Sequence, residues 1–272
     1  MLILLLSKIK LILKGLYESL EGFAEIPKSL AKFPIGLSHL KNPIDCYRIG
    51  NGEIKILFVS GVHGNEVGTV KLSYKLLNFL NKKYLDFPEI TFYVIPCLNP
   101  DGFLAAKKNK DFINGGKVGR FNNKNVDLNR NFNTPSFKKE SLWSFGKKYS
   151  QNIKVNCGDE GNSEPEIQAI IKFIETNNIK FIFSFHNVGA DVLPGDTELS
   201  KKIGDIYKKE TGYKIMLSEE WGKLKQTGTF KEWCDMRGLS FLEVETSKRW
   251  GSDWSKQKKA IEAVVGYLNS YK

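Results

Sequence analysis

Short apolar runs alternate with longer amphipathic segments along most of this chain. The apolar runs are rich in β-branched and aromatic residues, as expected of buried strands, and they cover 54–60, 90–96, 180–186 and 240–245. Apolar positions that recur every three or four residues predict helices at 67–83, 163–176, 197–211, 229–237 and 255–271. Strands that alternate with helices, without repeats or linkers, predict an α/β fold, a three-layer α/β/α sandwich with a mixed, mostly parallel central sheet.

A β-hairpin is predicted near the beginning of this fold. Gly50-Asn51-Gly52 separates Asp45–Ile49 from Glu53–Ser60, and Asn-Gly favours the positive φ angles that two-residue hairpin turns need. The two segments are therefore expected to pair with each other.

The remaining segments lack a clear period. Residues 105–125 and 133–162 are expected to be irregular loops. Asn125–Leu128 is expected to be a brief strand between them, and Asn99–Gly102 has the composition of a turn. Ser163 is the expected N-cap of the next helix, because acidic residues and a proline follow it.

The first 44 residues are expected to precede a main domain at 45–272. Leu2–Leu20 is interpreted as an amphipathic helix that either covers the domain or lies on a membrane surface, and the prolines after it mark a connecting segment. Lysines interrupt its apolar run too early for a membrane span, and a secretory signal is not indicated. A cytoplasmic location is therefore predicted.

The chain is basic, with 41 Lys and Arg against 30 Asp and Glu and a net charge of +11. The lysine pairs are spread evenly, which favours a solvated surface, although the charge would also attract an acidic peptide, a cell-wall polymer or a membrane. No nucleic acid-binding motif accompanies it, so no nucleic acid partner is expected. The four cysteines are widely spaced and are expected to be reduced.

Two of the three histidines end apolar strands, which indicates a metal site. His63 follows the strand at 54–60, Glu66 stands three residues later at a helix start, and His186 ends the strand at 180–186. Two imidazoles and one carboxylate are a usual protein ligand set for a catalytic zinc, and ligands collect at the carboxyl ends of strands. One Zn²⁺ per chain is predicted. His39 has no acid or cysteine near it in the sequence and is interpreted as incidental.

Other charged residues suit chemistry beside such a metal. Glu243 and Glu245 are two apart and share one face of the last strand, where a carboxylate would take a proton from water. Solvated edge carboxylates are the plainer alternative. Arg120 and Arg130 are candidates to bind a carboxylate or to stabilise an oxyanion.

In combination, these residues resemble the carboxypeptidase A/B family of zinc metallopeptidases over roughly 45–268. The motifs that carry the resemblance are His63-Gly64-Asn65-Glu66, Asn99-Pro100-Asp101-Gly102, Arg120, Val126-Asp127-Leu128-Asn129-Arg130-Asn131-Phe132, Ser163-Glu164-Pro165-Glu166, His186 and Glu245. The resemblance implies zinc on His63, Glu66 and His186. It also implies that Asp127 orients His63 from behind.

The resemblance also implies roles for the other motif residues. Glu245 would be the general base that activates water and then protonates the leaving amine. Asn129 and Arg130 would bind the terminal carboxylate of a peptide substrate, and Arg120 would stabilise the oxyanion. Glu245 is preferred to Glu243 because the family base stands two residues after a position usually occupied by threonine, here Glu243.

Two departures from the family pattern bear on specificity. Residues 214–244 contain no tyrosine where the family usually has one, and Trp221 is the only large aromatic residue at its expected place; the second departure is Glu243. The compact catalytic domain is more similar to bacterial murein peptide amidases and related carboxypeptidases. A peptide with a free carboxylate, such as a peptidoglycan stem peptide, is therefore the expected substrate.

Two other functions stay open. A zinc-dependent deacylase of the succinylglutamate desuccinylase and aspartoacylase type would share the motifs around His63 and Asp127. A non-catalytic module that binds peptide or glycan on the same fold would keep the ligand affinity without turnover.

Overall fold

The structure, a computed structural model, describes residues 22–109, 118–145 and 151–271. Its elements in chain order are β1 (Ala31–Leu37), β2 (Pro43–Ile49), β3 (Ile54–Val59), α2 (Val67–Lys83), η1 (Tyr84–Asp86), β4 (Ile90–Ile95), α3 (Pro100–Lys108), η3 (Leu128–Arg130), β5 (Glu140–Phe145), β6 (Gln151–Asn156), α4 (Pro165–Thr176), β7 (Phe181–Asn187), β8 (Asp191–Pro194), α5 (Glu198–Thr211), β9 (Lys214–Ile215), α6 (Ser218–Gly222), α7 (Phe230–Asp235), β10 (Ser240–Thr246) and α8 (Trp254–Asn269). The amphipathic helix expected at Leu2–Leu20 lies outside the described residues.

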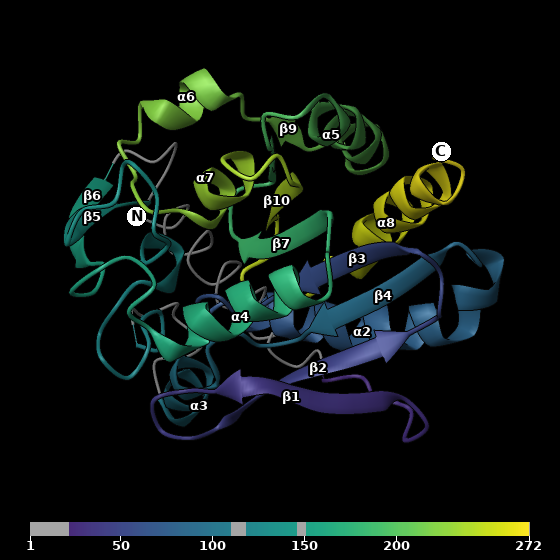
Figure 1. Cartoon of the computed structure of the whole chain (residues 1–272), viewed down its shortest axis with the longest axis horizontal. Coiled ribbons are helices and arrows are strands. Elements are labelled where there is room, and N and C mark those ends of the chain that lie inside the picture. The colour runs from purple at the N-terminus through teal and green to yellow at the C-terminus, as the bar shows by residue number, and fades with distance from the viewer. Residues whose placement is uncertain (1–21, 110–117, 146–150, 272) are drawn as a thin grey trace, which may run out of the picture.

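One eight-stranded sheet runs through the molecule in the order β1-β2-β4-β3-β7-β10-β8-β9 (Figure 1). Its central strands β4, β3, β7 and β10 are parallel, whereas β1–β2, β2–β4 and β10–β8 pair antiparallel. Helices flank both faces, and the mixed α/β fold predicted from the sequence is confirmed. No helix among the described residues is long and apolar enough to cross a membrane.

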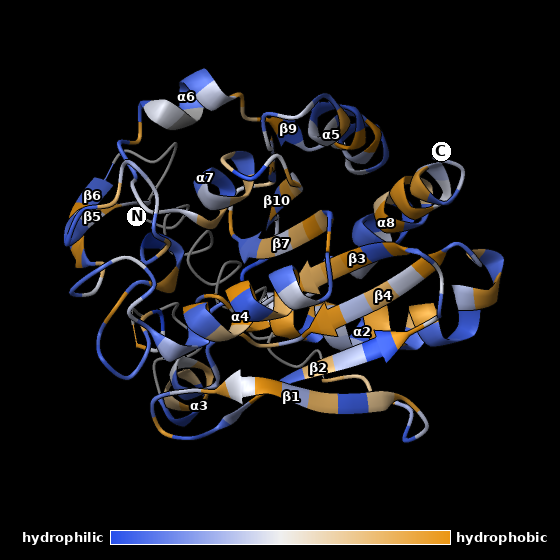
Figure 2. Cartoon of the chain, viewed as in Figure 1, coloured by the Kyte–Doolittle hydropathy of each residue, from blue (hydrophilic) through white to orange (hydrophobic). Residues whose placement is uncertain are grey.

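The two sides of the sheet follow from the alternation of side chains along each strand. On one side, residues such as Phe58 and Phe185 pack against α2, α5 and α8. On the other side, residues such as Leu57 and Ile182 pack against α4 and α7. The central strands are therefore apolar on both faces, and Figure 2 shows β3 and β4 as largely hydrophobic ribbons. Because Ser184, His186, Glu243 and Glu245 are in phase with Ile182 and Phe241, they lie on the side of α4 and α7.

The predicted hairpin between β2 and β3 is wrong. β4 lies between them and pairs antiparallel with β2 and parallel with β3. The turn at Gly50–Gly52 passes over the start of β4, where Thr91 Oγ1 donates to Gly52 O at 2.6 Å. A Cβ at Gly52 would lie 1.9 Å from the carbonyl carbon of Glu89, so only glycine allows this crossing. A local turn signal cannot reveal a strand that enters from elsewhere in the chain.

Several segments expected to be irregular contain regular structure. The connecting segment contains the edge strand β1, the second loop contains the β5–β6 hairpin, and Asn99–Gly102 opens helix α3 with Asn99 as its N-cap. The brief strand expected at Asn125–Leu128 is only an isolated bridge between Val126 and Asn156, followed by η3. Edge strands and single turns bury too little apolar surface to leave a periodic pattern.

Ser163 is not the N-cap of α4. Glu164 occupies that position without a side-chain capping bond, and Ser163 Oγ instead donates to Glu164 Oε1 at 2.8 Å and accepts from Asn131 Nδ2 at 2.9 Å. The interpretation of His39 as incidental is also wrong, because its Nε2 lies 2.7 Å from Glu164 Oε2. Ser163 and His39 thus both make contacts with residues far away in the sequence, which the local sequence pattern does not indicate.

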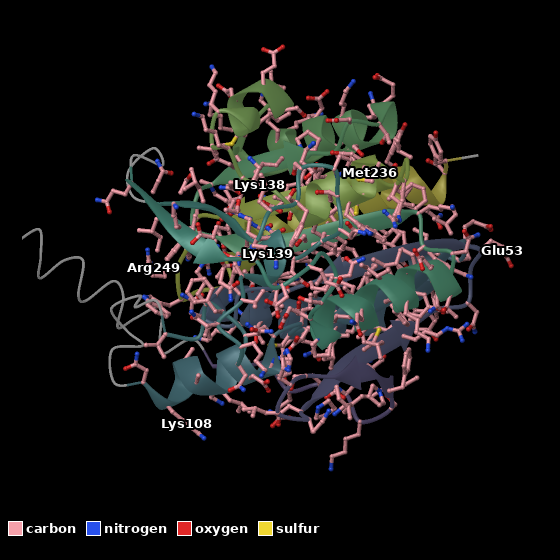
Figure 3. The ribbon with its side chains drawn as sticks, turned by 60° about the vertical axis from the view of Figure 1, so that its left-hand side comes forward. Glu53, Lys108, Lys138, Lys139, Met236 and Arg249 are labelled. Carbon is pink, nitrogen blue, oxygen red and sulfur yellow. The ribbon has the colours of Figure 1, made fainter. Side chains whose placement is uncertain are left out.

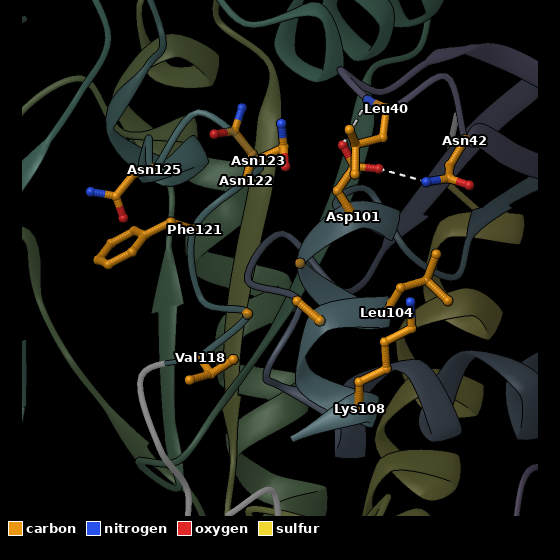
Figure 4. A pocket seen from close by; sticks show the side chains of 13 residues that line it. Leu40, Asn42, Asp101, Leu104, Lys108, Val118, Phe121, Asn122, Asn123 and Asn125 are labelled. Atoms are coloured by element: carbon orange, nitrogen blue, oxygen red, sulfur yellow. Dashed lines mark hydrogen bonds between the residues drawn. The ribbon is translucent and has the colours of Figure 1, made fainter. Parts of the chain in front are cut away.

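The loop between β1 and β2 is fixed to α3 by a single carboxylate. Asp101, 5% exposed, accepts from Ser38 Oγ at 2.6 Å, from Leu40 N at 3.0 Å and from Asn42 Nδ2 at 2.7 Å. Figure 4 shows two of these bonds beside the pocket next to α3.

Replacement of Asp101 by alanine is expected to destabilise the fold by about 2–4 kcal/mol, because three donors lose their shared acceptor. Urea denaturation would measure the free energy of unfolding. Asp86→Ala, which removes an exposed carboxylate paired with Lys83, is the control and should leave it nearly unchanged. Equal stability of the two variants would contradict the role of Asp101.

Candidate metal centre

The two ends of the β3–α2 connection bring a histidine and a glutamate together. His63 lies in the turn after β3, and Glu66 occupies the N-cap position of α2 with no side-chain capping bond, so its carboxylate is available to the histidine. Gly64 separates them at a point where the chain packs closely on the start of α3. A Cβ there would lie 2.2 Å from Phe103 N, which explains the glycine between the two residues.

Three side chains converge at this point. Glu66 Oε1 lies 2.9 Å from His63 Nδ1, and Glu66 Oε2 lies 3.1 Å from His186 Nδ1. The two Nδ1 atoms are 3.3 Å apart. His63, Glu66 and His186 are all buried, and they form one of two groups among the described residues whose donor atoms lie close enough to hold a metal ion.

The far side of the His63 ring is held by a second carboxylate. His63 Nε2 lies 3.0 Å from Asp127 Oδ1, and Arg120 Nη2 donates to Asp127 Oδ2 at 2.8 Å. Asp127 is fully buried at the start of η3, where it also accepts from Asn129 N at 3.1 Å. Burial alone would raise the pKa of Asp127, but the charges of Arg120 and His63 hold it well below its usual range.

The ionisation of the central group depends on its neighbours. Burial opposes charge on Glu66, but His63 and His186 hold its pKa below the ordinary value. Burial also opposes charge on His186, whose pKa is nevertheless raised to about 9 by the carboxylates of Glu243 and Glu66. Burial, reinforced by the charge of Glu66, raises the pKa of Glu245 to about 8.

The residues present fit a zinc ion. Two imidazole nitrogens and a carboxylate are its usual donors, and both Nε2 atoms are held from behind, which leaves the Nδ1 atoms for a metal. Apart from its 3.1 Å contact with His186 Nδ1, the buried Glu66 Oε2 makes no hydrogen bond with the described residues. With neutral imidazoles and ionised carboxylates, as metal binding requires, the four carboxylates (Glu66, Asp127, Glu243 and Glu245) and the two guanidinium groups (Arg120 and Arg130) would leave two negative charges, which a divalent cation would balance.

Glu245 and Arg120 border this group. Glu245 is opposite His186 in the register of β10 and β7, and its side chain makes no hydrogen bond or ion pair with any described residue. Arg120 Nη1 lies 3.8 Å from Glu66 Oε1, and its guanidinium stacks 4.1 Å from the centre of the Trp143 ring. Both side chains therefore lie where a substrate beside the metal would contact them.

Asn129 and Arg130 adjoin the group through Asp127 rather than contact the three donors. Arg130 is 2% exposed, and its Nη1 and Nε donate to Asn129 O at 2.6 Å and Leu142 O at 3.1 Å. Asn129 Oδ1 accepts from Phe230 N at the start of α7. These bonds fix the plane of the guanidinium and join η3 to the β5–β6 hairpin and to α7.

Sequence reasoning missed several contacts at this site. Trp143 lies in a stretch of sequence without periodicity, so nothing in the sequence indicates that its ring stacks on Arg120. Ser184 Oγ lies 3.0 Å from His186 Nε2, and its position two residues before His186 was the available hint. The second histidine–carboxylate group, His39 with Glu164 and Glu166, fixes the loop between β1 and β2.

The pocket shown in Figure 4 is separate from this centre. It has a volume of about 580 Å³ and is lined by residues of α3 and of the loop before η3, including Asp101, Leu104 and Phe121. None of the three clustered donors lines it. We therefore base function on the donor geometry rather than on this pocket.

The fold and the site together define an α/β protein with a candidate metal centre, whose donor side chains lie just after or at the ends of the parallel strands β3 and β7. The family model described as zinc carboxypeptidase matches residues 16–218, and the chain belongs to that family. It is accordingly a zinc metallocarboxypeptidase-type hydrolase. The matched region contains His63, Glu66, Asp127 and His186 and ends before β10.

Among curated proteins, the chain is similar to murein peptide amidase A of Vibrio campbellii, with 28% identity over 82% of this chain and 80% of that protein. It is also similar to the carboxypeptidase N catalytic chain of Rattus norvegicus, with 32% identity over 56% of this chain. The match spans only 35% of the length of that carboxypeptidase and, for carboxypeptidase D of Anas platyrhynchos, only 8%.

Solved structures share the fold. The murein-tripeptide amidase MpaA from Escherichia coli O157 has a TM-score of 0.67 at 23% identity and covers 91% of this chain and 94% of its own. Thrombin-activatable fibrinolysis inhibitor has a TM-score of 0.70 at 18% identity, with 90% and 73% covered.

His186→Ala is expected to reduce zinc content after dialysis from about one ion per chain to near zero, because one of three donors is lost. Elemental analysis would measure it. His39→Ala is the matched control from the other histidine–carboxylate group and should retain about one ion. If the His39 variant lost zinc and the His186 variant kept it, the metal would belong to the His39 group and our assignment would be wrong.

Proposed function

We propose that this chain hydrolyses the amide bond next to a free carboxylate at the end of a peptide, with a murein stem peptide as its substrate. The observation that carries the proposal is the convergence of His63 Nδ1, His186 Nδ1 and both oxygens of Glu66 beside Glu245, whose side chain makes no polar contact with the described residues. Zinc held by His63, Glu66 and His186 would supply a Lewis acid that acidifies water and polarises the scissile carbonyl.

Glu245 is the proposed general base. Burial and the charge of Glu66 raise its pKa to about 8 without a metal, and a bound divalent cation would lower it again, so that the ionised group can take a proton from water and then give it to the leaving nitrogen. No other described side chain competes for its oxygens. The proton taken in the first step thus returns to the departing amine, and the carboxylate is regenerated.

Arg120 is proposed to stabilise the negative charge that develops on the carbonyl oxygen. Asp127 holds it from one side, and the Trp143 ring supports its flat face. Its Nη1 points toward Glu66 at 3.8 Å. A guanidinium already held in place loses little freedom as the charge forms, which is the condition for effective electrostatic stabilisation.

Arg130, with Asn129, is proposed to bind the substrate carboxylate. Bonds to the carbonyls of Asn129 and Leu142 occupy Nη1 and Nε and leave Nη2 for the ligand. Burial lowers the pKa of Arg130 from its ordinary value, which reflects how poorly this cation is solvated. A buried cation beside the metal centre favours a substrate that brings its own negative charge.

A murein peptide is proposed as substrate because of similarity to murein peptide amidase A and because of charge. Lys108, Lys138, Lys139 and Arg249 are exposed on the side of the molecule that carries α3 and β5, whereas Glu53 lies at the opposite end, at the start of β3 (Figure 3). The site lies at the other end of β3, on the same side of the molecule as these basic side chains, which would favour the approach of an acidic peptide.

The substrate class can be tested with zinc-loaded protein and three substrate sets: peptidoglycan stem peptides, ordinary peptides and N-acyl amino acids. Mass spectrometry of the products should show cleavage of stem peptides beside a free carboxylate. Cleavage of only the N-acyl amino acids would establish a deacylase, and binding without any cleavage would establish a non-catalytic module.

Glu245→Gln is expected to reduce kcat by about 10²–10⁴-fold, because the amide cannot accept the proton from water. Zinc content should stay at about one ion per chain, since Glu245 is not among the three donors. Steady-state kinetics and elemental analysis would measure both. Normal turnover in this variant would refute its role as the base.

Arg130→Ala is expected to raise KM by about 10–100-fold for substrates with a free terminal carboxylate, because a charge-assisted pair is lost. C-terminally amidated substrates, which lack that charge, should show a much smaller change. Arg130→Lys keeps the cation without the planar fork and should recover part of the loss. An equal rise in KM for both substrate types would contradict carboxylate binding.

A further inference from the structure

A second carboxylate on β10 has no evident partner. Glu243 is 2% exposed, and its Oε2 makes no hydrogen bond with any described residue. Burial of an ionised carboxylate without a partner is costly, so its presence calls for a compensating positive charge. Glu243 stands two residues before the proposed base, on the same face of the strand.

Among the described residues, Glu243 forms its ion-pair contact with the far side of a proposed zinc ligand. Glu243 Oε2 lies 3.8 Å from His186 Nε2, and Ser184 Oγ lies 3.0 Å from the same nitrogen. Glu243 and Ser184 are opposite each other in the register of β10 and β7. The His186 ring is thus enclosed between Glu66 at Nδ1 and the pair of Ser184 and Glu243 at Nε2.

The other histidine also has a buried carboxylate behind it, although there the carboxylate itself is at hydrogen-bond distance, whereas behind His186 the hydrogen bond is made by Ser184 and Glu243 lies farther away. Behind His63, Asp127 Oδ1 lies 3.0 Å from Nε2, so that ring also has Glu66 on one side and a buried carboxylate on the other. A carboxylate behind an imidazole fixes the proton on the rear nitrogen, keeps the front lone pair toward the metal and increases the basicity of the ligand.

Two other roles for Glu243 fit the structure less well. A contact with a positively charged substrate group would require access, but Glu243 is closed off behind the imidazole ring. No hydrogen bond or ion pair joins Glu243 to Arg130; the charges of the two groups interact, but the Arg130 guanidinium donates to the carbonyls of Asn129 and Leu142.

We propose that Glu243 is a positioning residue for His186: Ser184 Oγ accepts the proton of Nε2, and the charge of Glu243, 3.8 Å from that nitrogen, stabilises this tautomer, which directs Nδ1 to the metal and strengthens zinc binding. The inference rests on the proposed zinc site. It assigns a task to a carboxylate at a position where the resemblance to carboxypeptidases leads one to expect threonine.

The test is the zinc dissociation constant of the full chain, measured by competition with a chromophoric chelator and without substrate. Glu243→Gln is expected to weaken zinc binding by about 10–100-fold, because the amide keeps the shape but loses the charge. Glu243→Thr, which also removes the charge and restores the residue usual in the family, should weaken binding to a similar degree. Ser184→Ala should weaken it less.

Glu232→Gln is the matched control. The Glu232 carboxylate is also partly buried and accepts from Thr134 and Ser136, but it has no contact with the three zinc donors. It should leave the zinc dissociation constant unchanged. Circular dichroism of the metal-free variants would check folding, and if Glu243→Gln does not fold, Glu243→Thr and Ser184→Ala decide the outcome.

An unchanged zinc affinity in the folded Glu243 variants would overturn the inference. Unchanged affinity combined with a selective loss of activity on substrates with a cationic terminal residue would also overturn it and would make Glu243 a substrate contact. Because zinc affinity is measured without turnover, a wild-type chain that binds zinc but hydrolyses nothing would refute the proposed function and leave this test intact.

Discussion

Compensation of buried charge is the constraint on which this structure depends. His63 and Glu66, from one turn, and His186, from a distant strand, form a buried cluster, and three further carboxylates and two guanidinium groups surround it. Such a cluster is stable only if its charges are paired, since unpaired ions are poorly tolerated away from water. Arg120 meets Asp127, and the remaining negative charge matches a divalent cation. The free energy of metal binding and the packing of β3, β7, β10 and η3 are therefore expected to depend on each other.

The register of the sheet brings the charged side chains of the site together. β7 and β10 run parallel, so His186 is opposite Glu245 and Ser184 is opposite Glu243. All four side chains share the side of α4 and α7, because each pair is two residues apart. A shift of one residue would turn all members of one strand to the opposite face, among the apolar side chains that pack on α2, α5 and α8. The apolar contacts of Phe183, Phe185, Leu242 and Val244 thus fix the position of the polar site.

Much of this could be predicted from the sequence, and the failures have a common cause. Strands and helices with a clear period were found, including β7, α5 and β10, and the mixed α/β fold is confirmed. The predicted pairing of β2 with β3 was wrong because β4, which begins roughly thirty residues after β3 ends, lies between them. The residues of a local turn do not encode such an insertion. His39 and Ser163 were misinterpreted for the same reason, since their partners Glu164 and Asn131 are long-range or lie outside the helix. The three donors do converge, whereas Trp143 and the environment of Glu243 emerged only in three dimensions.

Glu243 and Glu245 show how one chemical group acquires two behaviours within a single strand. Glu243 is enclosed behind an imidazole, and Glu245 is partly open with no polar contact among the described residues. They are also coupled, because Glu243 adds to the effects of burial and of Glu66 that raise the pKa of Glu245. In the proposed roles, the carboxylate that strengthens a metal ligand would therefore also make the neighbouring base hold its proton more tightly. A divalent cation offsets this repulsion for both residues, since its field lowers the cost of negative charge throughout the cluster. On this proposal, metal affinity and base strength are set together by the spacing of two residues on β10.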